Sequence, residues 1–152
     1  MYLIVKLLHI ASVVLFLGNI ITGLFWHAHA MRTRDPIVIT HTVAGLIRSD
    51  RIFTIPAVAA IIVLGIVLAM MGGYPLLHTG WILWSLVLFT VSGVAFMAQV
   101  SPLQRQMLTL ARSSPFEYQQ YASLARKWEV WGAVALLTPL AAMALMVLKP
   151  LP

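Results

Sequence analysis

The chain has 152 residues, of which 61% are hydrophobic and only 9% are charged, and its formal net charge is +6. This composition excludes an ordinary soluble domain, in which about one quarter of the residues are charged. Because the chain contains no cysteine, disulfides, thiolate metal sites and cysteine-held iron–sulfur clusters are also excluded.

Apolar segments long enough to cross a bilayer recur along the whole sequence. Each lacks Asp, Glu, Lys and Arg over about twenty residues, which as a helix crosses roughly 30 Å of hydrocarbon. Backbone hydrogen bonds must be satisfied inside the segment in lipid, so helices are expected. The sequence therefore predicts an all-α fold, a transmembrane four-helix bundle with helical cytoplasmic extensions, forming one integral membrane domain over residues 1–152. The predicted spans are residues 7–26, 52–71, 81–100 and 130–148.

The first predicted span carries a stripe of polar and aromatic residues. At steps of three and four residues one face collects His9, Ser12, Phe16, Asn19, Gly23 and Trp26. An amide facing lipid is costly, so we expect this face to point into the bundle and Asn19 to bond to a neighbouring helix.

His9 is the main candidate ligand, because neutral imidazole commonly binds haem iron and copper. No histidine occurs in the other predicted spans, so a second ligand has to be a methionine, a lysine or a loop histidine near the same end. The candidates are Met70, Met71, His78, Met143, Met146 and, nearer the chain ends, Lys6 and Lys149. The prediction is a haem b or copper site; the alternative is no cofactor, with His9 as a hydrogen-bonded structural residue.

The basic residues fall into two connections, and this predicts the topology. Four arginines separate the first two spans, and four basic residues separate the last two, whereas Gly72 to Gly80 has none. The positive-inside rule then makes the basic connections cytoplasmic and puts both termini outside the cytoplasm of a bacterial inner membrane. We expect the first connection to meet anionic lipid headgroups rather than nucleic acid. The residues predicted to do so are His27, His29, His41, Arg32, Arg34, Arg48 and Arg51.

The triplet His27-Ala28-His29 ends the first span, and three interpretations compete. As a metal site it is disfavoured, because residues two apart on a helix are rotated by about 200° and face opposite ways. Ala28-His29-Ala30 has the form of a signal-peptide cleavage site, but the apolar stretch is longer than usual and Arg32 follows it. The membrane-boundary interpretation is preferred.

Helix-start signals lie in both basic connections. Asp35 can cap a helix whose first residue is Pro36. Ser114, Pro115 and Glu117 have the pattern of a capping box.

The acidic residues are interpreted as lying at the cytoplasmic edge. With Asp50 and Glu129 both next to basic residues, no carboxylate is expected in mid-membrane. This counts against an ion-coupled transporter, which normally needs one.

Several quoted segments, in order, resemble a bacterial family of predicted integral membrane proteins of unknown function over nearly the whole chain. They are "MYLIVKLLHIASVVLFLG", "RTRDP", "RSDRIFTIP", "GGYPLLHTGWILWSLVLFTVSG" and "LLTPLAAMALMVLKP". The opening "YLIVKLLHI" also resembles the first helix of HemJ-type protoporphyrinogen oxidases and of CopD-type copper-resistance membrane proteins. The HemJ-type resemblance implies a haem b role for His9.

The leading functional hypothesis is a haem- or metal-associated redox protein with its site in the outer half of the bundle. The alternative is a non-catalytic scaffold, assembly partner or lipid-binding protein, and a small transporter comes third. A homo-oligomer or a place in a membrane complex fits any of these, and enzymatic activity stays open.

Overall fold

A computed structural model describes residues 1–150, and these residues form only helices and the connections between them. Two segments, η1 and η2, are π-helical. The elements are α1 (Tyr2–Thr33), α2 (Pro36–Ser49), η1 (Asp50–Thr54), α3 (Ile55–Met71), α4 (Gly80–Ala95), η2 (Phe96–Val100), α5 (Ser101–Ala111) and α6 (Tyr118–Leu148).

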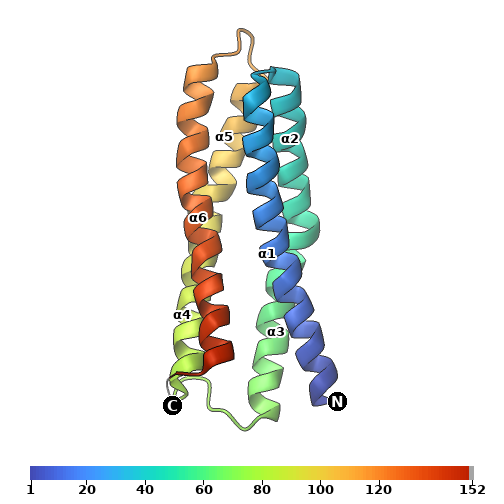
Figure 1. Ribbon diagram of the computed structural model, residues 1–152, viewed down its shortest axis with the longest axis vertical. Coiled ribbons are helices and arrows are strands. Elements are labelled where there is room, and N and C mark those ends of the chain that lie inside the picture. The colour runs from blue at the N-terminus through green and yellow to red at the C-terminus, as the bar shows by residue number, and fades with distance from the viewer. Residues whose placement is uncertain (151–152) are drawn as a thin grey trace.

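Within the described residues the segments join into four long helices that run alternately up and down (Figure 1). All four are long and apolar enough to cross a membrane; they cover Tyr2–Thr33, Pro36–Met71, Gly80–Ala111 and Tyr118–Leu148. The predicted all-α transmembrane bundle is confirmed. We call the end with the two basic connections the basic-loop end, and the end with both termini and the Gly72 to Thr79 connection the termini end.

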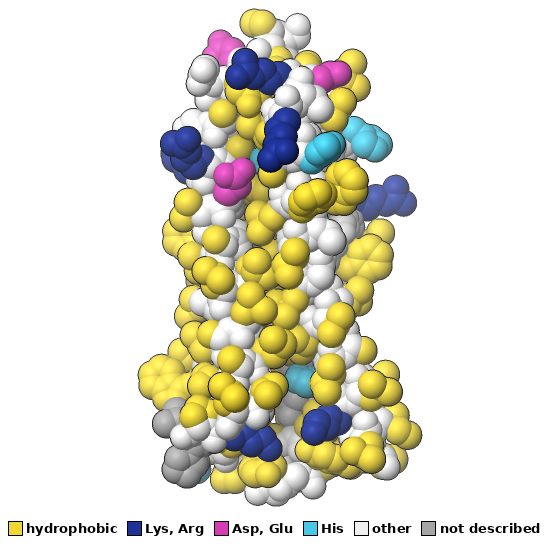
Figure 2. All heavy atoms as spheres, in the orientation of Figure 1, with side chains coloured by type: hydrophobic (Ala, Val, Ile, Leu, Met, Phe, Trp, Pro, Cys, Tyr) yellow, Lys and Arg dark blue, Asp and Glu magenta, His cyan; other side chains and the backbone are white. Residues whose placement is uncertain are grey.

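The surface matches a protein that sits in a bilayer. On the face drawn in Figure 2, a broad hydrophobic band separates the charged and histidine side chains of the basic-loop end from a few basic side chains at the termini end. Large apolar side chains such as Val14, Val63 and Leu137 are more than half exposed along this band. Lipid tails are their natural neighbours.

The helix-start signals have different outcomes at the two basic connections. The Asp35 carboxylate accepts a hydrogen bond from the Ile37 backbone N–H at 2.8 Å, with Pro36 as the first helical residue, so this prediction is confirmed. The capping box was wrong, because α6 begins only at Tyr118 and Glu117 makes no side-chain cap. Phe116, just before the helix, packs against the core ring of Tyr121.

The helices pack differently at the two ends. Near the termini end they form two pairs, α1 with α3 and α4 with α6, whereas at the basic-loop end α1, α2, α5 and α6 pack around one core (Figure 1). Serines hold the α4–α6 pair: Ser85 Oγ donates to the Ala142 carbonyl and Ser92 Oγ to the Ala135 carbonyl. Small residues let helices approach closely in membranes.

Both π-helical segments end two residues before a proline. Thr54 precedes Pro56 in the second long helix, and Val100 precedes Pro102 in the third. Proline lacks the N–H for the helical ladder and its ring clashes with the carbonyl four residues earlier, so a wider turn relieves the conflict. Pro139 lies inside α6, which stays α-helical throughout.

Candidate functional site

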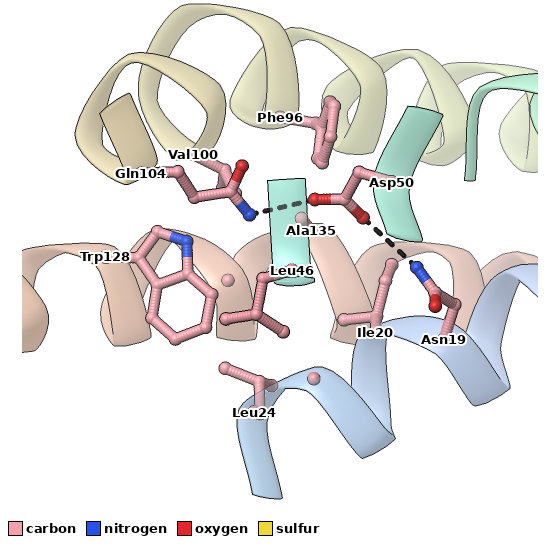
Figure 3. A pocket seen from close by; sticks show the side chains of 12 residues that line it. Asn19, Ile20, Leu24, Leu46, Asp50, Phe96, Val100, Gln104, Trp128 and Ala135 are labelled. Carbon is pink, nitrogen blue, oxygen red and sulfur yellow. Dashed lines mark hydrogen bonds between the residues drawn. The ribbon is translucent and has the colours of Figure 1, made fainter. Parts of the chain in front are cut away.

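The carboxylate of Asp50 is the centre of a hydrogen-bond network inside the bundle (Figure 3). Its Oδ1 accepts from Asn19 Nδ2 at 3.1 Å and from Thr54 Oγ1 at 2.8 Å. Its Oδ2 accepts from Gln104 Nε2 at 2.8 Å. The network therefore joins α1, η1 and α5, which come from both halves of the chain.

Asn19 is the second hub of this network. Besides contacting Asp50, its Nδ2 lies 2.8 Å from Thr54 Oγ1, and its Oδ1 accepts a hydrogen bond from the Ser49 hydroxyl. The prediction that Asn19 bonds to a neighbouring helix is confirmed. Every polar atom of this amide is engaged with the second long helix.

The Asp50 carboxylate, predicted to lie at the cytoplasmic edge, points into the bundle. Asp50 contacts Asn19, which lies inside the first predicted span and near the middle of α1. Arg48 and Arg51 beside it are exposed, and this pair suggested an interfacial segment. Helix geometry separates them, because Asp50 points inward while the arginines point out.

A small cavity of about 30 Å³ lies next to the carboxylate, with room for one or two water molecules. Its walls combine the Asp50 network with side chains from η2 and α6. The lining residues are Asn19, Ile20, Gly23, Leu24, Leu46, Asp50, Phe96, Val100, Gln104, Trp128, Gly132 and Ala135. Within the described part of the chain, the buried Trp128 Nε1 has no hydrogen-bond partner. Buried donors are normally paired, so this N–H can bond a water molecule in the cavity.

A second polar cluster surrounds His27, closer to the basic-loop end. Only 1% of His27 is exposed, and its Nε2 lies 3.0 Å from the hydroxyl of the buried Tyr121. Its ring meets the Trp128 ring edge-on, with centroids 4.8 Å apart. Its Nδ1 lies 3.8 Å from Glu129 Oε1, and the Glu129 side chain is 48% exposed. The cluster thus leads from an exposed carboxylate to a buried tyrosine.

His27 therefore corrects the prediction of a surface group that meets lipid headgroups, because burial removes it from their reach. His29 is exposed and stacks on Phe25, so the two histidines do face opposite ways as predicted. His41 is exposed too, as are the predicted lipid-facing arginines Arg32, Arg34, Arg48 and Arg51. Contact of these exposed residues with anionic lipid stays a prediction.

His9 is half-buried between α1 and α3. Its Cε1 lies 3.2 Å from where a Cβ on Gly65 would stand, so the ring rests on the α3 backbone. Its Nδ1 is buried and makes no hydrogen bond of good geometry, although the Ile61 backbone lies beside the ring.

The candidate second ligands are scattered around this termini end. Met70 is 74% exposed, Met71, His78 and Met143 are also exposed, and Met146 is half-buried. In residues 1–150 no hydrogen bond or ring contact joins His9 to any of them, and no group of three His, Cys, Asp or Glu side chains could hold a metal. The structure thus supplies one imidazole here, and the haem or copper site stays a prediction.

Comparison with known proteins gives one match. The sequence model of a family described as predicted integral membrane protein (DUF2269) matches residues 3–150. No curated protein and no solved structure matches the chain. These comparisons do not support the first-helix resemblance to HemJ-type and CopD-type proteins, which stays a resemblance.

Proposed function

The chain belongs to this DUF2269 family of integral membrane proteins, and we propose that it is a proton-coupled membrane protein of the small-transporter class, with Asp50 as the group that binds and releases the proton. One observation carries this proposal: the Asp50 carboxylate lies within the bundle beside Asn19 rather than at its edge. The sequence argument against a transporter depended on the absence of such a carboxylate.

The position of Asp50 has an energetic cost that a purely structural residue need not incur. An ionisable side chain within a membrane helix is costly, by up to about 3 kcal/mol at the helix centre on insertion scales. An amide or a hydroxyl could tie Asn19 and Gln104 together without that cost. A carboxyl group adds the ability to exchange a proton, and intramembrane carboxyls commonly serve proton relays for this reason.

The surroundings of Asp50 suit a proton better than a metal cation. Asn19, Thr54 and Gln104 all present hydrogen-bond donors to the carboxylate. The Asn19 oxygen is already engaged by Ser49. Hard cations require several oxygen ligands, and a shell of N–H and O–H donors does not provide them. A proton needs only a free lone pair on the carboxylate.

Infrared difference spectroscopy in lipid vesicles tests this function. The acid-minus-alkaline spectrum should contain a carbonyl band of a protonated carboxylic acid that Asp50→Asn removes. Glu117→Gln is the matched control, because Glu117 is exposed and its loss should leave the Asp50 band in place. Identical spectra for wild type and Asp50→Asn would contradict the proposal and favour the scaffold alternative, in which the network only locks helices together.

The orientation is part of the proposal. The exposed arginines gather at the basic-loop end, so we assign that end to the cytoplasm of a bacterial inner membrane and both termini to the opposite side. Anionic lipid headgroups are then the expected neighbours of His29, His41 and the four arginines of the first connection.

A haem or copper role for His9 is the second candidate, and it is supported by a half-buried imidazole inside a membrane helix. Absorption spectra of the purified protein, oxidised and dithionite-reduced, together with elemental analysis, test it. A Soret band, or bound copper, should be lost in His9→Ala and retained in His29→Ala. A colourless, metal-free preparation would contradict this role without affecting the proposal for Asp50.

A further inference from the structure

Trp128 stands between the two polar clusters of the bundle interior. One side of its indole ring meets the His27 ring, with centroids 4.8 Å apart. The residue also lines the cavity next to Asp50, and Figure 3 shows the indole nitrogen on the side of the ring nearer Gln104. Trp128 is only 4% exposed. The Trp128 side chain therefore lies between the Asp50 cavity, which it lines, and His27, which it contacts.

The His27 cluster offers a polar route to the basic-loop end. Its outermost member, Glu129, is about half exposed. The buried Nδ1 of His27 has no hydrogen-bond partner in the described residues and is directed toward that carboxylate. Imidazole can accept a proton on one ring nitrogen and release one from the other, and carboxylates exchange protons readily with water. Protons can thus approach Trp128 from this end.

The other side of the Asp50 network is closed by apolar side chains. Phe16 and Leu17 precede Asn19 toward the termini end, and Ala57 and Ile61 follow Thr54 in the same direction. The Phe16 ring meets the Phe89 ring, with centroids 5.8 Å apart, and thereby bridges the two helix pairs. Apolar constrictions exclude water and ions. This cluster, which we call the apolar plug, carries no group that can hold a proton.

We propose that Trp128 is the gate through which protons reach Asp50 from the basic-loop end, while the apolar plug closes the opposite side in the conformation seen here. This inference rests on the proposed function. In the closed arrangement seen here, the cavity holds a water molecule that accepts from Trp128 Nε1 and donates to the Asp50 carboxylate. When the indole moves aside, a proton passes from the His27 side through water to a carboxylate oxygen of Asp50, and no electron is transferred.

The cavity fits this ligand in size and chemistry. A volume of about 30 Å³ exceeds the 10–15 Å³ or so that one water needs. The indole N–H needs an acceptor, while the carboxylate, which already accepts three hydrogen bonds, retains capacity for a fourth. Water can do both at once. A metal cation would be repelled by the indole donor.

Hydrogen–deuterium exchange of the protonated Asp50 band, followed by infrared spectroscopy in lipid vesicles, tests the gate. Trp128→Ala should speed the exchange by at least about tenfold, the change expected when a barrier falls by about 1.4 kcal/mol. Phe16→Ala is the matched control, since it opens a cavity on the opposite side of Asp50. Apolar cavities stay dry, so exchange in Phe16→Ala should match wild type.

The outcomes separate the gate from the proposed function. Equal exchange in wild type and Trp128→Ala, or equal acceleration by Phe16→Ala, would overturn the gate while the Asp50 band itself persists. Absence of that band in wild type would instead overturn proton binding at Asp50. If Trp128→Ala loses its helical circular dichroism, Trp128→Phe replaces it, because the smaller ring keeps most of the packing. Its exchange should then exceed the wild-type rate, and an unchanged rate would refute the gate.

Discussion

Replacing Asp50 with alanine should lower the free energy of unfolding by about 2–3 kcal/mol, because buried donors that bond to its carboxylate lose their partner. The Gln104 amide would lose its acceptor inside the bundle, and Asn19 Nδ2 would keep only Thr54 Oγ1. Each buried donor left without a partner costs about 1–3 kcal/mol. Denaturant titration in detergent micelles, followed by circular dichroism, measures the change.

Two asparagine variants control for this effect. Asp50→Asn keeps the side-chain shape and one acceptor oxygen, and Gln104 can turn its own oxygen toward the new amide. The free energy of unfolding should therefore fall clearly less in Asp50→Asn than in Asp50→Ala. Asp35→Asn makes the same chemical change at an exposed helix cap, where asparagine is also a good cap, and should be nearly neutral. If Asp50→Ala changed the free energy of unfolding as little as Asp35→Asn, the network would contribute nothing to stability.

The fold was predictable because its signals are local and strong. Each long helix contains an uncharged apolar segment long enough to cross a bilayer, and in lipid such a segment has few alternatives to a helix. The Asp35–Pro36 start was equally readable, since cap and proline act within one turn. The capping box at Ser114 failed although its pattern is equally local, because α6 begins at Tyr118 without a side-chain cap.

Of the residues in the site, only Asn19 on α1 could be predicted from the sequence. The polar stripe through Asn19 correctly predicted an interhelical bond, because an amide inside an apolar span has to find a partner. Its partner was missed, since Asp50 is flanked by Arg48 and Arg51 and the three together look like a membrane boundary. One signal was available: Gln104 shares the buried face of α5 with Met107 and Ala111, and an amide on such a face calls for a partner.

Both π-helical segments contribute residues to this site. A five-residue π turn shifts the helix face relative to a regular α-helix, and Asp50 and Thr54, the two ends of η1, both reach Asn19. In the third helix, Phe96 and Val100 are the two ends of η2, and both line the cavity. Prolines two residues beyond each segment mark these places in the sequence. Such π turns frequently lie at functional sites.

The second large effect on stability is expected at His27, the first residue of the His27-Ala28-His29 triplet. His27→Ala should destabilise the protein by about 3 kcal/mol, because it leaves a cavity beside Trp128 and removes the hydrogen-bond partner of the buried Tyr121 hydroxyl. His29→Ala, two residues away on the exposed face, should change the stability by less than about 0.5 kcal/mol. The same denaturant titration compares the two variants directly.

A double-mutant cycle isolates the His27–Tyr121 hydrogen bond from the cavity. Tyr121→Phe removes only the hydroxyl, and combined with His27→Ala it should cost less than the sum of the single changes, with a coupling of about 1 kcal/mol. Additive effects would mean that the 3.0 Å contact is not a stabilising hydrogen bond. Equal effects of His27→Ala and His29→Ala would place both imidazoles at the surface. His27 could then not belong to a buried polar route, and the gate at Trp128 would open onto lipid headgroups instead.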